Sequence, residues 1–306
     1  MIIQNASADP LSDVLALAGL RAACSVRLQA GGDWALRFRP LELKFNVIRR
    51  GACWLTVDAR PAQQLRSGDG FVIVQTPFVL GSAPELPPVD AALAFAEPGM
   101  SARIGQGTDV EILGGSVTLA GAGATGLIAL LPKALVIRAE ARGASSFGWL
   151  LDELDREWHA NLAGGHAVCN DLLRLMFVHA LRQHVATADA EGLGWLAGLR
   201  DPAIAATLRA IHADPARSWR LVELAKIAGL SRSGFAQRFK IRVGQSPVEY
   251  AARWRMQLAA ARLTETQDSV SAIAASLGYL SDAAFGVAFR RVHGTTPGLY
   301  RRRHPC

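Results

Sequence analysis

The clearest hydrophobic pattern in this chain is a repeat in its last third. Residues 224–250 and 273–300 place apolar, glycine and proline positions in the same order, with one residue inserted after the first glycine. Such agreement at small, aromatic and turn positions predicts two copies of one structural unit. The aligned pairs are Ala225 with Ala274, Gly229 with Gly278, Phe235 with Phe285, Phe239 with Phe289, Gly244 with Gly294, Pro247 with Pro297, and Tyr250 with Tyr300.

Each copy predicts a helix, a short glycine turn and a second helix. Gly229 stands where the first helix should end in a left-handed conformation, and Ser231 can cap the next helix. Phe235 and Phe239 are four residues apart, so both should face the same core from a helix at 231–242. This order is typical of a helix-turn-helix unit, and a plain pair of helical hairpins is the alternative.

The segment between the two copies predicts one continuous helix that starts at Pro247. It has no further glycine or proline before the second copy, and Tyr250, Trp254, Leu258 and Ala261 lie on a shared stripe. A continuous helix would hold the two units at a fixed separation. Their second helices could then enter successive segments of a DNA major groove, about one helical turn apart.

The first two thirds of the chain show a different pattern. Short apolar segments between polar turns recur from about residue 20 to 140, which predicts strands in a sandwich or barrel. Residues 146–186 predict two amphipathic helices, and the glycine-rich stretch 191–202 predicts a link between domains. The expected domains are therefore 1–145, a helical hairpin and linker at 146–200, and 201–306. The fold class is α+β, with an N-terminal β-barrel and a C-terminal all-α domain.

Charge separates the same regions. Residues 201–306 hold 16 Lys and Arg against 7 Asp and Glu, whereas residues 1–200 hold 17 against 19. A basic domain beside a near-neutral one is typical of a nucleic-acid binder, and a solvated basic face is the alternative. The length of 306 residues suits two domains. No apolar run is long enough for a transmembrane helix and no signal peptide is indicated, so we expect a cytoplasmic protein that does not engage a membrane.

Residues 201–306 resemble the DNA-binding domain of the AraC/XylS family of bacterial transcription regulators. The stretch LGYLSDAAFGVAFRRVHGTTPGLYRR at 277–302 carries most of this resemblance. Residues 45–75 and 126–138, followed by the predicted helical hairpin, resemble the cupin-type sensor domain of one AraC subgroup. The resemblance implies double-stranded DNA and RNA polymerase as partners. In the resembling family such a hairpin often forms a dimer contact, so the resemblance implies this role for residues 146–186. Packing inside one chain is the alternative.

The resemblance places the second helix of each unit in the major groove. Arg232 could then pair with guanine and Gln237 with adenine, whereas Lys240 and Arg242 should meet phosphate. The second unit offers few side chains that can hydrogen-bond a base, so it should mainly bind phosphate, with help from Arg301, Arg302 and Arg303. The full set of expected DNA-binding residues is Arg232, Ser233, Ala236, Gln237, Lys240, Arg242, Asp282, Ala283, Val287, Arg290 and Arg291, and the orientation of Arg238 is left open.

Cupin domains often bind metal through clustered histidines, but no histidine precedes His159. Asn46 and Phe78 stand where related sensor domains often carry histidine. We therefore expect no metal, no cofactor and no enzyme activity. A small organic effector inside the barrel is still possible, and simple core packing is the alternative for each aromatic residue. The candidate ligand-lining residues are Trp34, Phe38, Trp54, Phe71 and Phe78.

The cysteines and histidines give no sign of another site. Cys24, Cys53, Cys169 and Cys306 lack the spacing of a zinc or redox motif and are expected to be free thiols. The leading hypothesis is a sequence-specific transcription regulator whose N-terminal domain senses a small molecule, forms a homodimer, or does both. The alternative is a regulator whose cupin-like domain binds no ligand and only dimerises or contacts a protein. The sequence does not identify the operator or the effector, or whether the protein activates or represses transcription.

Overall fold

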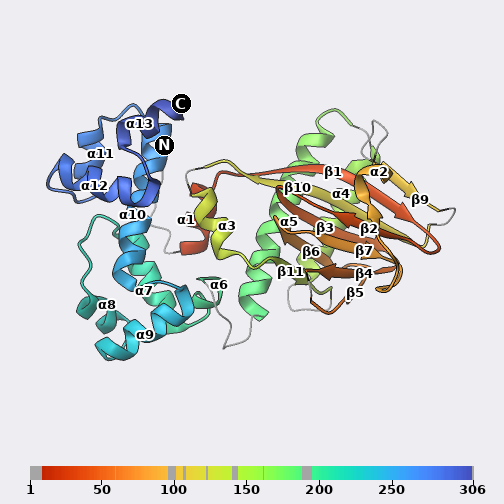
Figure 1. Ribbon diagram of the computed structural model, residues 1–306, viewed down its shortest axis with the longest axis horizontal. Coiled ribbons are helices and arrows are strands. Elements are labelled where there is room, and N and C mark those ends of the chain that lie inside the picture. The colour runs from red at the N-terminus through yellow and green to blue at the C-terminus, as the bar shows by residue number, and fades with distance from the viewer. Residues whose placement is uncertain are drawn as a thin grey trace. The chain divides into compact units, whose positions relative to one another are not determined.

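The computed structural model describes residues 9–58, 60–95, 101–105, 108–121, 123–139, 144–160, 162–187 and 195–304. These residues fall into two compact units. The sheet unit spans Leu20–Thr118 and Leu131–Thr187, and the helical unit takes its residues from Met1–Gly19, Leu119–Leu130 and Ala188–Cys306. The expected α+β fold class is confirmed, with strands in the N-terminal part and an all-helical C-terminal part (Figure 1).

The sheet unit contains two sheets and two long helices. The six-stranded sheet has the order β11-β6-β3-β10-β1-β9, and the five-stranded sheet has the order β5-β4-β7-β2-β8. The elements are β1 (Leu20–Ala30), β2 (Ala35–Phe38), β3 (Leu43–Arg50), β4 (Ala52–Val57), β5 (Gln63–Arg66), β6 (Gly70–Val74), β7 (Phe78–Gly81), β8 (Val89–Asp90), α2 (Ala91–Ala94), β9 (Ser101–Ile104), β10 (Val110–Leu119), β11 (Ala134–Ile137), α4 (Ala144–Ala160) and α5 (Gly165–Thr187).

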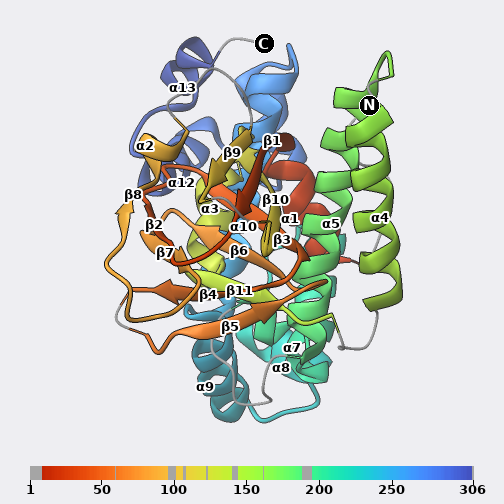
Figure 2. The same ribbon diagram turned by 90° about the vertical axis from the view of Figure 1, so that its right-hand side faces the viewer.

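The main core of the sheet unit lies between the two sheets. Alternate residues of each strand point to opposite faces, so one face of the six-stranded sheet contributes Leu28, Ile48 and Ile73, and the other sheet contributes Leu36 and Leu80. Helices α4 and α5 lie side by side (Figures 1 and 2). These two helices cover the other face of the six-stranded sheet, where the ring of Phe45 meets that of Phe147 on α4 at 6.0 Å between centroids.

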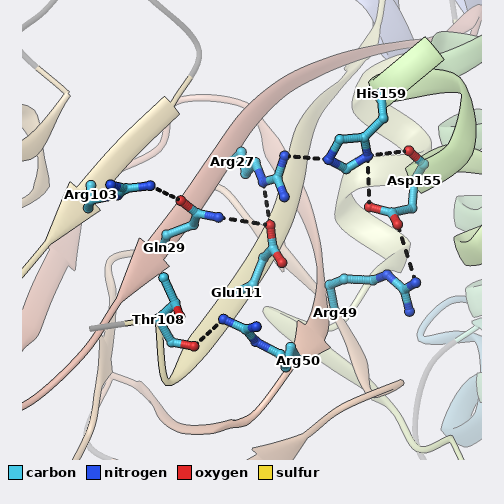
Figure 3. A network of polar contacts seen from close by, with 9 residues as sticks. All are labelled: Arg27, Gln29, Arg49, Arg50, Arg103, Thr108, Glu111, Asp155 and His159. Atoms are coloured by element: carbon cyan, nitrogen blue, oxygen red, sulfur yellow. Dashed lines mark hydrogen bonds and ion pairs between the residues drawn. The ribbon is translucent and has the colours of Figure 1, made fainter. Parts of the chain in front are cut away.

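A chain of polar contacts holds α4 against this sheet (Figure 3). Arg27 on β1 pairs with Glu111 on β10 and also contacts His159 Nε2 through its Nη1 atom, at 2.7 Å. His159 lies 3.5 Å from Asp155, which pairs in turn with Arg49 on β3 at 3.2 Å. Three strands and one helix are therefore joined through one network of polar contacts.

The helical unit contains the predicted repeat. Its elements are α1 (Pro10–Leu17), α3 (Ala124–Leu130), α6 (Trp195–Gly198), α7 (Pro202–Ala213), α8 (Leu221–Ile227), α9 (Arg232–Val243), α10 (Pro247–Glu265), α11 (Val270–Ser276), α12 (Asp282–His293) and α13 (Pro297–Arg303). The helix predicted at 231–242 is α9, and the predicted continuous connector is α10. Both expectations are confirmed.

The predicted turns have the required backbone geometry. Gly229 and Gly278 adopt φ values of +66° and +79°, and Gly244 ends α9 at φ +82°. A side chain at these positions would be strained, because L residues rarely adopt this conformation. Ser231 accepts a hydrogen bond from the backbone N–H of Gly234, as expected of a helix cap.

Each half of α10 carries one phenylalanine core. Near its start, Phe239 packs edge-on against Tyr250, with ring centroids 6.0 Å apart. Near its end, Phe285 and Phe289 are fully buried in a cluster that includes Leu263. The three phenylalanines named here, with Phe235, are among the largest fully buried groups in the chain. Helix α10 is thus shared by both helix-turn-helix units.

The compact units differ from the expected domain boundaries in three places. Helices α1 and α3 group with the helical unit, although both precede residue 145. Helices α4 and α5 group with the sheet unit. In the predicted link at 191–202, residues 191–194 lie outside the described residues, and the following α6 is packed rather than free, since Trp195 is fully buried. Among the described residues, no helix is long and apolar enough to cross a membrane.

A directed chain of hydrogen bonds runs through the helical unit. Trp195 Nε1 donates to the hydroxyl of Tyr250 at 2.9 Å, and that hydroxyl lies 2.8 Å from His212 Nε2. His212 Nδ1 lies 2.9 Å from a carboxylate oxygen of Asp13 on α1. Burial lowers the pKa of His212 and raises that of Tyr250, so both are neutral near pH 7. Each donor then faces one acceptor: tryptophan to tyrosine, tyrosine to histidine, histidine to aspartate.

Replacing Tyr250 with phenylalanine should destabilise the helical unit. The substitution leaves Trp195 Nε1 and His212 Nε2 buried without a partner, which costs roughly 1–3 kcal/mol of unfolding free energy. Urea denaturation of the full chain measures this. Tyr279→Phe is the matched control, because the half-buried Tyr279 hydroxyl has no hydrogen bond within the described residues. Equal loss of unfolding free energy from both substitutions would contradict the stabilising role of these hydrogen bonds.

Stability should also fall as the pH is lowered below 6.5. The pKa of His212 is lower in the folded protein than its ordinary value of 6.5, so the unfolded chain binds more protons in this range. The unfolding free energy then drops as pH falls, by at most about 1.4 kcal/mol per pH unit for one group. Denaturation at pH 7.5 and 5.5 should show a smaller difference for His212→Gln than for the wild type. If His212→Gln shows the same pH dependence of stability as the wild type, His212 does not cause that dependence.

Candidate nucleic-acid interface

Helix α9 presents a polar face opposite its buried phenylalanines. Arg232, Ser233, Gln237 and Lys240 are exposed, and Ala236 is half-buried between them. Neither Arg232 nor Lys240 forms an ion pair with a described residue. Their charges are therefore available to an external anion, and the Gln237 amide can donate and accept a hydrogen bond.

Two other arginines of α9 are bound to Asp201 within the protein. Arg238 Nε donates to Asp201 Oδ2 at 2.6 Å, and Arg242 Nε lies 3.9 Å from the same oxygen. Asp201 also caps α7 by accepting from the backbone N–H groups of Ala203 and Ile204. The sequence left the orientation of Arg238 open, and the structure assigns it to this internal bridge. Arg242 is half-buried, so it is less accessible to DNA than Lys240.

Helix α12 offers a different surface. Ala283 and Val287 are exposed, and Val287 is 72% exposed. Asp282 accepts a hydrogen bond from Ser271, so its carboxylate is already engaged. Arg290 and Arg291 lie exposed in the last turn and form no ion pair with a described residue. The face combines small apolar groups with two available cations at one end.

The three arginines of α13 are not equivalent. Arg301 donates from Nε to the carbonyl of Leu263 at 3.1 Å and from Nη2 to that of Asp268 at 2.6 Å. These carbonyls lie at and beyond the end of α10, so Arg301 satisfies backbone acceptors that the helix leaves unpaired. Arg302 and Arg303 are exposed. Sequence alone grouped all three as phosphate contacts, because no local signal distinguishes a residue that caps a distant helix.

The sheet unit holds a cavity of about 460 Å³. Two of the five aromatic candidates, Phe38 and Phe78, line it. Trp34 and Phe71 lie in the apolar core between the sheets, and Trp54 is half-buried on β4 between the core residues Cys53 and Leu55. The described lining residues are Val26, Arg37, Phe38, Arg39, Pro40, Lys44, Asn46, Phe78, Asp90, Ala91, Ala92, Phe95 and Gly115.

The predicted ligand contacts did not include the polar lining residues of this cavity. Lys44 and Asn46 share the strand parity of Ile48, which lies in the core between the sheets. That alternation is a usable signal, because residues two apart on a strand face the same side. Arg37, Arg39 and Phe95 carry no such signal, since β2 and the segment after α2 are too short to show a pattern.

No metal centre is apparent in the described part of the chain. It contains no group of three or more His, Cys, Asp or Glu side chains that could hold a metal ion. Cys53 and Cys169 are buried and free, and burial raises the pKa of the Cys53 thiol to about 12. The side chain of Cys24 and all of Cys306 lie outside the described set. Cys53 is thus an unreactive thiol near neutral pH.

Substitution by methionine should lower stability at Arg301 and DNA affinity at Arg302. Arg301→Met removes two hydrogen bonds to carbonyls and should lower the unfolding free energy by roughly 1–3 kcal/mol. Arg302→Met should leave stability unchanged and lower affinity for any duplex, with the salt slope reduced by about 0.9. Thermal denaturation and DNA titration at several salt concentrations measure both effects. The assignment fails if Arg301→Met is as stable as the wild type.

Two family models match this chain. A model described as a cupin matches residues 9–186, and one described as a helix-turn-helix domain matches residues 224–303. The first covers more than half of the chain, and the second spans α9 to α13 in full. The two matched segments correspond to the two resemblances in the sequence.

Similar proteins are known over the full length. Two putative AraC-like transcription regulators, from Streptomyces lividans and Streptomyces antibioticus, are each 43% identical over 302 residues, which is 97% of this chain and 99% of the relative. Among solved structures, the DNA-binding domain of AdpA in complex with a target DNA is 28% identical, with a TM-score of 0.32, and covers 34% of this chain and 92% of that one. The chain belongs to the AraC family of transcription regulators, with a cupin domain ahead of a helix-turn-helix DNA-binding domain.

Proposed function

We propose that this regulator reads a specific operator mainly through α9. The observation that carries the proposal is the exposed polar face of that helix, whose Arg232 and Gln237 are free to contact base edges. Arginine pairs well with guanine, and glutamine with adenine. The buried Phe235 and Phe239 fix the rotation of the helix, so this face and not another is presented.

Helix α12 is proposed to anchor the backbone of the duplex. Arg290 and Arg291 suit phosphate, whereas the exposed Ala283 and Val287 can only contact apolar groups such as thymine methyls. The rigid connector supports simultaneous binding. At about 1.5 Å per residue, the 19 residues of α10 span about 29 Å, which is comparable with the ~34 Å of one DNA turn.

The cupin domain is proposed to sense a small organic effector in its cavity. The volume of about 460 Å³ lies within the range of roughly 300–1,000 Å³ that is usual for small-molecule sites. Aromatic walls and a few polar groups are also typical of such sites. Binding there would alter the affinity of the full chain for its operator.

A dimerising role for the same domain is the second candidate. Trp149 on α4 and Val168 and Leu175 on α5 are 62%, 41% and 48% exposed, which is unusual for such large apolar side chains. These helices belong to the hairpin that the family resemblance associates with dimer contacts. Sedimentation of the wild type and of Trp149→Ser tests this role, and RNA polymerase is the further protein partner that the family implies.

Substitutions on α9 and α12 should separate readout from anchoring. Arg232→Ala or Gln237→Ala should cost about 1–3 kcal/mol on the preferred operator and relax the preference at one or two base pairs. Arg290→Ala should weaken binding to all sequences and lower the salt slope by about one. Selection of binding sites from a random duplex pool, followed by titration at several salt concentrations, measures both.

Arg66→Ala supplies the control, because it removes an exposed arginine on β5 of the sheet unit. It should leave the preferred sequence and the salt slope unchanged. If each α9 and α12 substitution reduces affinity equally for the selected operator and for random DNA, the proposed division of labour is wrong.

A further inference from the structure

The cavity of the cupin domain contains polar side chains at positions where a sheet sandwich usually places apolar ones. On β3, Ile48 packs in the core between the sheets, and Asn46 and Lys44 occupy the next two positions of the same parity. Both residues line the cavity. Placing a lysine and an amide on an inner face costs free energy unless each finds a partner.

A glycine opposite Asn46 makes room for its amide. Gly114 on β10 is the register partner of Asn46, and a Cβ atom at Gly114 would overlap Asn46 Oδ1. The amide oxygen therefore fills the space that the glycine leaves. The Nδ2 atom of Asn46 is buried and has no hydrogen-bond partner among the described residues. The cavity wall thus holds a buried donor that no described group satisfies.

The opposite wall is flat and aromatic. The rings of Phe38 and Phe78 stack with centroids 4.7 Å apart and an interplanar angle of 7°. The ring of Phe95 lies 6.4 Å from that of Phe38, at an angle of 53°. Aromatic surfaces of this kind bind apolar and planar groups, so this wall suits the body of a ligand rather than its charged end.

The charges around the cavity are mostly positive and partly uncompensated. Arg39 pairs with Asp90 at 3.0 Å, and the second oxygen of Asp90 accepts from the backbone N–H of Ala92. Both acceptor atoms of Asp90 are therefore engaged. The side chain of Lys44 forms no ion pair or hydrogen bond with a described residue, whereas Arg37 is exposed between the inward-facing Leu36 and Phe38 and so faces away from the core. Apart from the Asn46 amide oxygen beside Gly114, the unpaired side-chain groups described at the inner face of the cavity are the donors of Lys44 and Asn46.

We propose that the effector of this regulator is a small organic anion, a carboxylate on an apolar and preferably planar body. Its carboxylate lies against Lys44 and Asn46 Nδ2, and its body lies against the phenylalanine wall. The inference rests on the sensing role proposed above and deepens it. A cationic ligand would meet like charge at Lys44, and a neutral ligand without an acceptor would leave the donors of Lys44 and Asn46 unpaired.

Matched probes test the charge requirement on the full chain. The probes are 4-phenylbutyrate and 2-naphthoate, each compared with its own primary amide by isothermal titration calorimetry. We expect at least one carboxylate to bind about tenfold or more tightly than its amide, because charge-assisted hydrogen bonds are stronger than neutral ones. 4-Phenylbutylamine, the cationic analogue, should not bind.

Three variants locate the site. Lys44→Met keeps most of the length of the side chain but removes its charge, and it should reduce carboxylate affinity to that of the amide. Val26→Trp fills the cavity and should abolish binding of both probes. Arg66→Gln removes an exposed charge on β5, outside the cavity, and should leave binding unchanged. Thermal denaturation checks that each variant is folded.

The outcomes distinguish this inference from the proposed function. Lack of carboxylate binding, equal affinity for acid and amide, or undiminished binding by folded Lys44→Met would overturn the anion proposal. Operator affinity is measured separately with and without the bound carboxylate. A carboxylate that binds through Lys44 but leaves operator affinity unchanged supports the ligand class and contradicts the sensing role.

Discussion

The packing of two phenylalanine pairs against one uninterrupted helix is the constraint on which the DNA-binding surface depends. Phe235 and Phe239 bury α9 near the start of α10, and Phe285 and Phe289 bury α12 near its end. Each pair sets which face of its helix is exposed. Because α10 has no break, the two exposed faces cannot rotate independently. Recognition by this protein is therefore a property of the core as much as of the surface.

The start of α10 is fixed by polar contacts as well as apolar ones. Tyr250 lies at the centre of a chain in which Trp195, His212 and Asp13 each supply one partner. Buried polar groups are costly unless every member is satisfied, and here the donors and acceptors match in one direction only. The ring of His212 also stacks on that of Trp254, with centroids 4.0 Å apart. Helix α1 is thereby joined to the DNA-binding helices through a specific neutral histidine.

Much of the helical unit could be predicted from the sequence because its signals are local. Gly229 and Gly244 mark turns through their own backbone conformation, and Ser231 caps the helix that it precedes. The bond from Arg301 to the carbonyl of Leu263 spans 38 residues, and the contact between Asp13 and His212 spans 199. Neither leaves a periodic pattern, so the capping role of Arg301 and the place of α1 in the helical unit could not be predicted from spacing.

In the sheet unit, the alternation of side chains along β3 indicates the polar cavity residues, whereas aromatic composition alone does not separate ligand contacts from core residues. The sequence suggested large rings as ligand contacts, and two of those rings do line the cavity, but Trp34 and Phe71 complete the apolar core instead. The polar residues on β3 are the better indicators. A protein selected only for stability would carry apolar side chains in place of Lys44 and Asn46, since an unpartnered donor on an inner face is costly. That cost is expected where a site is kept ready for a ligand, because the ligand then supplies the missing acceptors and gains affinity from a cavity that is already formed.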